Sequence, residues 1–340
     1  MNAKSEVTWT EYLMGNFNIY KIKLIFLLNI SNYCSFHGIF ELVKAIFGKP
    51  KVLITFKNGN SIVVGREEIF TRLWFFFDKL TIDTRLKKLE TAMNLKLFEV
   101  EGSKLLQFVY LNKNIQFSYN SEDDLLTILM ALDVTFIQRK WRMIECKGNI
   151  IVDVGGNVGD TAIYFALNGA KKVITIEPFP SLFEILRNAV SYQNSDTILC
   201  INNTFEGFVE GHSFKANGNM SYPYFGSYFG PEDVLKRDDF SKTENASFND
   251  LLNSDEIYNN YILKLSCAGC EYYLLKLSTV YLRHFKQIVV EYSYGYRSIC
   301  NKLKKSGYVV TYSKPIGTFG RNLKNHDVFL GIIIANRQNL

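Results

Sequence analysis

The pattern of apolar and polar positions along this 340-residue chain changes at Asn149. In the second part, short continuous apolar runs alternate with helix-length amphipathic segments, which is the pattern of parallel strands covered on both faces. The last two runs are close enough in sequence to pair antiparallel. We therefore predict an α/β fold with a doubly wound, seven-stranded sheet. The predicted strands are Ile150–Val154, Lys172–Ile176, Thr197–Ile201, Tyr261–Leu265, Gln287–Glu291, Tyr308–Tyr312 and Val328–Ile334.

The first part of the chain is less regular. Helical spacing of apolar residues in 19–26 and 40–47 predicts an N-terminal helical segment at 1–48. Two hairpins are expected in an α+β domain at 49–146, and the sheet domain occupies 147–340. The first hairpin has an Asn58-Gly59 turn, and both residues tolerate positive φ. The predicted hairpin strands are Lys51–Phe56, Ser61–Val64, Lys104–Tyr110 and Asn114–Tyr119, and the predicted helices are Glu67–Lys79 and Asp123–Gln138.

Composition sets broad limits on the protein. Hydrophobic residues make up 47% of the chain, which allows a large core, and the net charge of +6 permits anionic ligands without requiring nucleic acid. The start of the chain lacks the basic and then apolar pattern of a secretory signal, so a cytoplasmic location is expected. The apolar stretch Leu24–Ile30 is far shorter than the about 20 residues that cross a membrane, so no transmembrane segment is expected.

Cys267 and Cys270 form a C-x-x-C pair. A structural zinc site needs four ligands, and the sequence has no second pair, so no metal site is expected. A thioredoxin-like role would need a different fold context. The other cysteines are scattered, which favours reduced thiols. The pair is therefore predicted to act as small buried hydrophobic residues.

A glycine-rich turn follows the first strand of the sheet domain. Gly155, Gly156 and Gly159 have no Cβ to keep a ligand away from the backbone, and Asn157 tolerates unusual φ. Asp153, at the strand tip, can accept from an ammonium group, and the helix start that follows offers N–H donors to a carboxylate. The spacing departs from the dinucleotide pattern G-x-G-x-x-G, so the turn suits a ligand without a pyrophosphate.

Glu177 ends the second strand, 24 residues after Asp153. A carboxylate at this place can accept from both hydroxyls of a ribose. Pro178 ends the strand, Ser181–Glu184 reads as a capping box for the next helix, and Asn203 follows the third strand as a further candidate ligand residue. The alternative is a doubly wound sheet in which the glycines serve only tight turns.

Five segments together resemble the FkbM family of S-adenosylmethionine (SAM) dependent methyltransferases. The resemblance covers about residues 147–336 and implies a seven-stranded methyltransferase fold. It also implies methyl transfer from SAM, usually to a hydroxyl of a sugar or natural product, so the expected acceptor is a glycan or a small metabolite. The segments that carry the resemblance are Val152–Ala166, Gly169–Val173, Glu177–Pro180, Leu263–Tyr272 and Ile288–Glu291.

The chain departs from the family pattern at the fourth and fifth strands. Where the family has Asp-x-Glu-Gly-x-Glu, this chain has Ser266 and Ala268 in place of the first two carboxylates, and Glu271 remains. Where many relatives show Glu-x-His, the chain reads Glu291-Tyr-Ser293. A hydroxyl is a poor nucleophile, and a carboxylate or histidine usually orients it or takes its proton.

These departures leave three hypotheses open. The first is a SAM-dependent O-methyltransferase in which Ser266, Glu271 and Glu291 border the acceptor site, with His284 a further candidate base. The second is a catalytically impaired relative that binds SAM and serves a binding or regulatory role. The third, a nicotinamide enzyme, is disfavoured by the glycine spacing. The aromatic-rich stretch His212–Pro231 suits either stacking on an acceptor or an ordinary insertion.

Overall fold

The computed structural model describes most of the chain. The described residues are 27–47 except 29 and 33, 51–65, 82–210, 212–214, 242–244, and 261–338 except 268 and 322–326. The predicted helical spacing in 19–26, the predicted helix Glu67–Lys79, Ala268 and most of the aromatic stretch lie outside these ranges. Within that stretch, β9 (His212–Phe214) pairs antiparallel with β10 (Lys242–Glu244).

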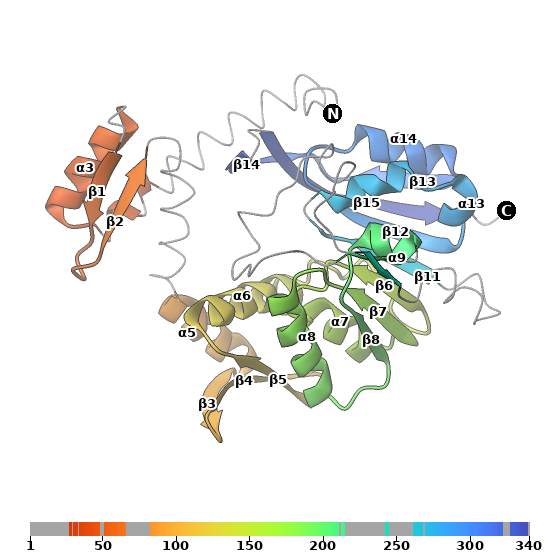
Figure 1. Ribbon diagram of the computed structural model, residues 1–340, viewed down its shortest axis with the longest axis horizontal. Helices are drawn as coiled ribbons and strands as arrows, with labels where there is room; N and C mark the ends of the chain where they lie inside the picture. Colours follow the sequence, from red (N-terminus) through yellow and green to blue (C-terminus); the bar gives the residue numbers. More distant parts are fainter. Residues whose placement is uncertain are drawn as a thin grey trace.

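A twisted, mostly parallel sheet organises the second part of the chain (Figure 1). The strand order is β13-β15-β12-β11-β6-β7-β8, with β15 antiparallel to both of its neighbours and a further strand, β14, paired to β15. All seven predicted strands are present, and the predicted α/β fold class is confirmed. The strands are β6 (Ile150–Val154), β7 (Lys172–Ile176), β8 (Ile198–Ile201), β11 (Tyr261–Leu265), β12 (Phe285–Tyr292), β13 (Tyr308–Tyr312), β14 (Ile316–Arg321) and β15 (Asp327–Arg337).

Helices cover both faces of this sheet. Successive residues of a strand point in opposite directions, so Ile150, Val152 and Val154 of β6 enter one hydrophobic core and Ile151 enters the other. The first core packs under α9, η2, α13 and α14, and the second under α7 and α8. The helices are α7 (Asp160–Leu167), α8 (Pro180–Tyr192), α9 (Phe205–Glu210), η2 (Cys270–Leu275), α13 (Thr279–Leu282) and α14 (Arg297–Lys305).

The start of α8 differs from the prediction. The helix begins at Pro180, and its N-cap residue, Phe179, makes no side-chain cap hydrogen bond. Proline suits the first helical turn because the N–H that it lacks would have no partner there. The predicted capping box at Ser181–Glu184 is therefore wrong.

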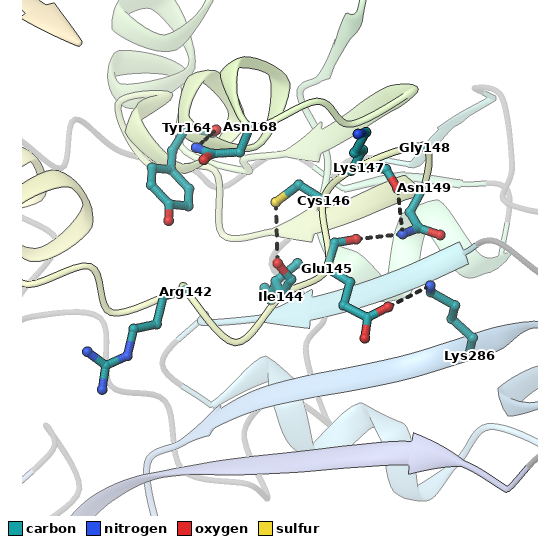
Figure 2. A pocket seen from close by; sticks show the side chains of 10 residues that line it. All are labelled: Arg142, Ile144, Glu145, Cys146, Lys147, Gly148, Asn149, Tyr164, Asn168 and Lys286. Carbon is teal, nitrogen blue, oxygen red and sulfur yellow. Dashed lines mark hydrogen bonds and ion pairs between the residues drawn. The ribbon is translucent and has the colours of Figure 1, made fainter. Parts of the chain in front are cut away.

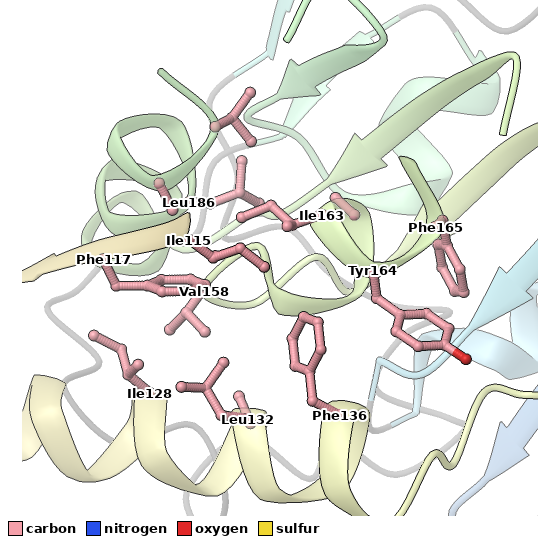
Figure 3. Packing of buried hydrophobic residues seen from close by; sticks show 14 of the residues in the cluster. Ile115, Phe117, Ile128, Leu132, Phe136, Val158, Ile163, Tyr164, Phe165 and Leu186 are labelled. Carbon is pink, nitrogen blue, oxygen red and sulfur yellow. The ribbon is translucent and has the colours of Figure 1, made fainter. Parts of the chain in front are cut away.

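Residues 82–146 pack onto the sheet domain through a shared core. Figure 3 shows Ile128, Leu132 and Phe136 facing side chains of α7 and α8, and the Phe136 and Tyr164 rings meet edge to face at 5.7 Å. The second predicted hairpin is confirmed, whereas α5 and β3 were not predicted. The domain division near residue 146 remains a prediction. The elements are α5 (Ile82–Met93), β3 (Lys96–Val100), β4 (Ser103–Tyr110), β5 (Lys113–Tyr119), α6 (Glu122–Leu132) and the π-helix η1 (Asp133–Ile137).

The first predicted hairpin forms as expected. Its strands are β1 (Lys51–Thr55) and β2 (Ser61–Gly65), and Gly59 in the turn has a φ of 85°. Helix α3 (Phe36–Ile46) packs against β1, and this unit is drawn in red and orange in Figure 1. Among the helices that the structure describes, none is long and apolar enough to cross a membrane.

Ser121 caps α6 and so fixes the start of the helix that leads to the cavity described below. Its side chain accepts from the N–H of Asp124 at 3.1 Å, and the Asp124 side chain accepts from the N–H of Ser121 at 3.1 Å. We expect Ser121→Ala to lower the free energy of unfolding by about 1 kcal/mol, because a first-turn N–H loses its acceptor. Chemical denaturation measures this, with the exposed Ser103 of β4 as the matched Ser→Ala control. Equal losses in the two variants would contradict the capping role.

Candidate functional site

A cavity of about 310 Å³ opens at the carboxyl edge of β6, β11 and β12. The strand order reverses at β6, since β7 lies on one side of it and β11 on the other. Doubly wound sheets bind their ligands in the crevice at such a point. The lining includes Gly155, Asn157, Asp160, Thr161, Glu177, Phe179, Leu182, Lys264, Ser266, Cys267 and Glu291, together with Val134, Thr135, Lys140 and Trp141 from η1 and the loop after it.

The glycine turn after β6 packs too tightly for side chains. A Cβ on Gly155 would lie 2.1 Å from the carbonyl oxygen of Ser266, and Gly155 has a φ of 79°. A Cβ on Gly156 would lie 2.2 Å from Oγ1 of Thr175. Gly159, with a φ of 94°, is the N-cap residue of α7 and packs on α8. The glycines are therefore required by the approach of β7, β11 and α8, whatever the cavity holds.

The backbone of this turn is bonded within the protein, which corrects one expectation. The N–H groups of Gly155 and Gly156 both donate to the carbonyl of Ile176, and that of Gly159 donates to Gly156. The N–H of Asn157 donates to Glu177. The sequence suggested that the backbone of this turn faces a ligand. Instead, the N–H groups of Gly155, Gly156 and Asn157 donate to residues at the end of β7 and so hold β6 to β7. The side chain of Asn157 offers an acceptor instead, because its buried Oδ1 has no partner among the described residues.

Glu177, a predicted ligand-binding residue, lines the cavity. Its Oε2 accepts from the N–H of Asn157 at 2.8 Å, and its Oε1 accepts from the N–H of Phe179 at 3.0 Å. Burial raises the pKa of this carboxyl to about 7, against the opposing effect of the two backbone donors. A carboxyl group with free lone pairs facing the cavity can still accept from a ligand.

Asn203 lies apart from the cavity lining. It is fully buried, and its Oδ1 accepts from the N–H of Thr204 at 2.8 Å. The preceding residue, Asn202, donates to the carbonyl of Glu177 at 2.8 Å. Asn202 thus supports the backbone at Glu177, whereas Asn203 holds the start of the segment that follows it.

A buried ion pair lies beneath the cavity. The carboxylate of Asp153 is 0% exposed, and its Oδ1 lies 2.7 Å from Nζ of Lys264, which is 1% exposed. Thr161 and Thr175 donate to the other oxygen of Asp153 at 2.6 and 3.3 Å. Lys264 also donates to the carbonyl of Gly155 at 2.9 Å. The pair joins β6 to β11 and holds the glycine turn between them.

This ion pair changes the expected role of Asp153. The sequence suggested that Asp153 accepts from the ammonium of a ligand, but Lys264 supplies that ammonium from within the fold. Lys264 was missed because β11 reads as an apolar strand. The sequence does contain an indication of this role, because a lysine within a strand that is buried on both faces needs an anionic partner. Alternation places Lys264 and Asp153 on the same face, in paired register.

Ser266 and Glu291, two of the three residues proposed from the sequence to border an acceptor, meet at the cavity. Oγ of Ser266 donates to Oε2 of Glu291 at 2.5 Å, and Lys140 forms an ion pair with Oε1 of Glu291. Burial by itself raises the pKa of Glu291, but the Lys140 ammonium and the hydrogen bond from Ser266 outweigh it and hold this pKa below its usual value. No sequence pattern pointed to Lys140, which comes from the loop after η1.

Glu271, the third predicted acceptor-site residue, lies behind the cavity wall. Its carboxyl is 0% exposed and accepts from the N–H groups of Gly269 at 2.6 Å and Ser293 at 2.8 Å. Burial raises its pKa to about 7. Glu271 therefore ties the loop after β11 to the end of β12. His284 precedes β12, so it lies at the opposite edge of the sheet from the cavity.

The C-x-x-C pair also differs from the prediction. Cys267 and Cys270 form a disulfide, with their Cα atoms 5.4 Å apart, and both residues are partly exposed. A separation of this size is compatible with a disulfide, whereas the sequence had favoured reduced, buried thiols. The loop after β11 brings Cys267 back to Cys270, the first residue of η2.

The π-helix η1 supplies a further polar contact that the sequence did not reveal. Thr135 donates to the carboxyl of Asp160, the first residue of α7, and both residues line the cavity. Burial raises the pKa of Asp160 to about 6, although the Thr135 hydrogen bond opposes the shift. Short π-helical segments occur often at functional sites. Here the widened turn brings Val134 and Thr135 to the cavity wall.

A second hollow lies at the other edge of the sheet (Figure 2). Its lining includes Glu145, Asn149 and Lys286, which precede or begin β6 and β12. Glu145 and Lys286 form an ion pair at 3.0 Å, and the Asn149 side chain donates to the carbonyls of Glu145 and Lys147. These contacts bind the loop before β6 to itself and to β12.

In the described part of the chain, no group of three or more His, Cys, Asp or Glu residues could hold a metal ion.

Comparison with solved structures gives distant similarities to methyltransferases. No family model matches the chain, and no curated protein matches it. The structure of TYW2 from M. jannaschii in complex with AdoMet is 13% identical, with 72% of this chain and 93% of that chain covered and a TM-score of 0.35. The magnesium protoporphyrin IX methyltransferase of Synechocystis with bound SAM is 10% identical, with 65% and 86% covered and a TM-score of 0.34. A SAM-dependent methyltransferase from Agrobacterium tumefaciens is 8% identical, with 71% and 72% covered and a TM-score of 0.36. Similarities this low assign neither a family nor a ligand.

Proposed function

We propose that the protein binds SAM in the cavity at the carboxyl edge of β6 and transfers its methyl group to a hydroxyl. One observation carries this proposal. Glu177, at the end of β7, and the unpartnered Oδ1 of Asn157, in the glycine turn, line the same cavity at the point where the strand order reverses. The resemblance of residues 147–336 to the FkbM family supports the same assignment.

The groups that line the cavity fit SAM. The carboxyl of Glu177 can accept from the two ribose hydroxyls, and Oδ1 of Asn157 can accept from an ammonium or amino group. Phe179 and Leu182 add apolar surface near Glu177 on which a flat base can lie. Asp153 and Lys264 take an indirect part, because they hold the glycine turn in place from below.

When bound, SAM supplies an electrophilic methyl group on a positively charged sulfur. Glu291 is the cavity residue suited to the acceptor, because its low pKa keeps it charged and a charged carboxylate accepts strongly from a hydroxyl. Ser266 and Lys140 fix the position of Glu291 from two sides. In this role Glu291 orients the acceptor hydroxyl toward the methyl group. Positioning of this kind contributes a large part of the rate acceleration in group-transfer reactions.

A second candidate function follows from the same contacts. Glu291 is already engaged by Lys140 and Ser266, and its lowered pKa makes it a weak base. Ser266 stands where the FkbM pattern has a carboxylate, and it cannot replace a base near neutral pH. A relative that binds SAM but transfers no methyl group would show these features together with an intact cofactor cavity.

Methyl transfer distinguishes the two candidates. The full chain is incubated with SAM labelled in its methyl group and a panel of glycans, hydroxylated metabolites and, as a separate arm, RNA. Label on a hydroxyl acceptor, lost in Glu291→Gln while SAM binding persists, supports the enzyme. SAM binding without transfer to any acceptor supports the binding role, and label only on RNA would refute the proposed acceptor class.

We expect Glu177→Ala to weaken SAM binding by about 1.5–3 kcal/mol, the range for hydrogen bonds to a charged group. The carboxyl lines the cavity, and its removal leaves the ribose hydroxyls without this acceptor. Calorimetric titration measures the change. Ser103→Ala, on the exposed start of β4, is the control and should bind as the wild type does. Wild-type affinity in Glu177→Ala would exclude Glu177 as the ribose acceptor.

The affinity for SAM should also rise with pH between about 6 and 8. Glu177 has a pKa of about 7 because it is buried, so it is largely protonated at pH 6 and charged at pH 8. The charged form accepts more strongly from hydroxyls, so binding favours it. A shift of one pKa unit on binding corresponds to about a tenfold change in affinity. Titrations at several pH values test this, and Glu177→Ala should lose this part of the pH dependence. If SAM affinity depends on pH in the same way in the wild type and in Glu177→Ala, Glu177 is not the group that accepts from the ribose.

A further inference from the structure

The disulfide between Cys267 and Cys270 borders the cavity. Cys267 is among the residues that line it. Cys270 begins η2, whose side chains enter the same hydrophobic core as Val152 and Val154 of β6. Both cysteines are partly exposed, unlike Cys34, Cys146 and Cys300, which are buried free thiols. A small thiol reagent that enters the cavity therefore meets a disulfide at its wall.

The backbone at Cys267 is pressed against the glycine turn. A Cβ on Gly155 would lie 3.5 Å from Cα of Cys267 and 2.1 Å from the carbonyl oxygen of Ser266. The N–H of Ser266 donates to the carbonyl of Val154 at 3.1 Å, which aligns the two segments. A change in the loop that carries Cys267 is thus transmitted directly to the turn that forms the cavity.

A buried carboxyl lies beside the disulfide. Oε2 of Glu271 is 3.9 Å from Sγ of Cys267, and the same carboxyl holds the N–H groups of Gly269 and Ser293. A sulfur in a disulfide has no hydrogen to donate, so this contact becomes a hydrogen bond only after reduction. With a pKa raised to about 7 by burial, Glu271 can give a proton to a thiolate that forms next to it.

We propose that Cys267 and Cys270 form a redox-active pair that exchanges with dithiols through the cavity, and that its oxidation state sets the shape of the cavity and its affinity for the ligand. The identity of that ligand as SAM rests on the proposed function; the exchange and the change of shape do not. Oxidised, the disulfide ties the cavity wall at Cys267 to η2. Reduced, the wall is released and the ligand is held less tightly.

The exchange balances with a dithiol as the reductant. One thiolate of the dithiol attacks Sγ of Cys267, the bond to Cys270 breaks, and Cys270 leaves as a thiolate that takes up a proton. The second thiol of the dithiol then attacks the mixed disulfide and becomes oxidised. Cys267 leaves as a thiolate, and Glu271 lies within reach to protonate it. Two electrons pass from the dithiol to the protein.

The experiment uses the 340-residue chain in its native state, equilibrated in buffers of reduced and oxidised dithiothreitol. Alkylation and mass spectrometry count the thiols at each cysteine. Trp141 lines the cavity, so the fluorescence difference between wild type and Trp141→Phe reports its shape without any ligand. Calorimetry then measures the binding of S-adenosylhomocysteine, the demethylated product, to both states. Cys200→Ser, at a partly exposed free cysteine of β8, is the matched control.

The expected result is reduction of Cys267 and Cys270 without unfolding, a change in Trp141 fluorescence, and binding weaker by about fivefold or more in the reduced state. By linkage, the ligand must stabilise the disulfide by that same factor. Cys200→Ser should respond to the buffers as the wild type does. Cys270→Ser should show the Trp141 fluorescence and the affinity of the reduced protein in both oxidising and reducing buffers.

Two results would overturn the inference. One is that these cysteines resist native-state exchange, and the other is that Trp141 fluorescence is the same in both states. Because these readouts need only the wild-type chain, Trp141→Phe and dithiothreitol, a misfolded cysteine variant leaves them intact. If Trp141 responds and S-adenosylhomocysteine binds neither state, the SAM proposal fails and the redox pair stands. If it binds both states equally, the claimed control of affinity fails while the SAM site stands.

Discussion

Lys264→Met is expected to lower the free energy of unfolding by about 3–5 kcal/mol, the cost of breaking a buried ion pair by removing one partner. The carboxylate of Asp153 is 0% exposed, and Nζ of Lys264, at 2.7 Å, is the cation that faces it. Methionine fills a similar volume, so the loss comes from the uncompensated charge. The turn should loosen as well, because Gly155 loses the donor to its carbonyl.

Two further variants isolate the buried charge. Lys286→Met removes the same kind of side chain from a pair with Glu145, whose side chain is 73% exposed, and it should cost less than about 1 kcal/mol. The double variant Asp153→Asn with Lys264→Met removes both charges and should recover most of the lost stability. Urea denaturation of the four proteins measures these changes. Equal losses in Lys264→Met and Lys286→Met would contradict the role assigned to the buried pair.

Gly155→Ala should lower the free energy of unfolding by about 2–5 kcal/mol and weaken SAM binding by about tenfold or more. Two costs add together in this variant. Alanine is strained at a φ of 79°, and its Cβ would lie 2.1 Å from the carbonyl oxygen of Ser266. Since that neighbour is backbone, β6 and β11 must move apart at the cavity.

Gly102→Ala is the matched control, because Gly102 has a φ of 78° and a Cβ added there would meet no atom within 4 Å. It should cost about 1–2 kcal/mol, which is the backbone strain alone, and leave SAM binding unchanged. Thermal or chemical denaturation and calorimetric titration test both variants. If Gly155→Ala costs no more than Gly102→Ala, the close approach of Ser266 does not constrain the turn.

The sheet was predictable because its signal is local and repeated. Most of its strands are apolar along nearly their whole length, and the Asp153 turn and Glu177 mark the ends of two neighbours. Strand β14, helix α5 and strand β3 were missed. The helix α5 has few buried apolar positions, chiefly Leu89 and Met93, and β3 is mostly exposed, so neither shows a clear hydrophobic pattern.

The candidate site was predictable only in part. Position along a strand brought Glu177, Ser266 and Glu291 to one cavity, because parallel strands end at the same edge of a sheet. The partners of these residues come from farther away in sequence. Lys140 is 151 residues from Glu291, and no local pattern indicates that contact. Glu271 looked like an acceptor residue from its place in the motif, but burial and two backbone donors give it a structural role.

Calorimetric titration of the full chain with SAM, and separately with NAD, tests the central claim most directly. The cavity offers Glu177 and Asn157 to a nucleoside with an amino-acid tail. The N–H groups of Gly155, Gly156, Asn157 and Gly159 in the glycine turn are bonded within the protein, so these four do not donate to a pyrophosphate. We expect saturable binding of SAM at a single site and no binding of NAD. Binding of NAD with no response to SAM would contradict the account.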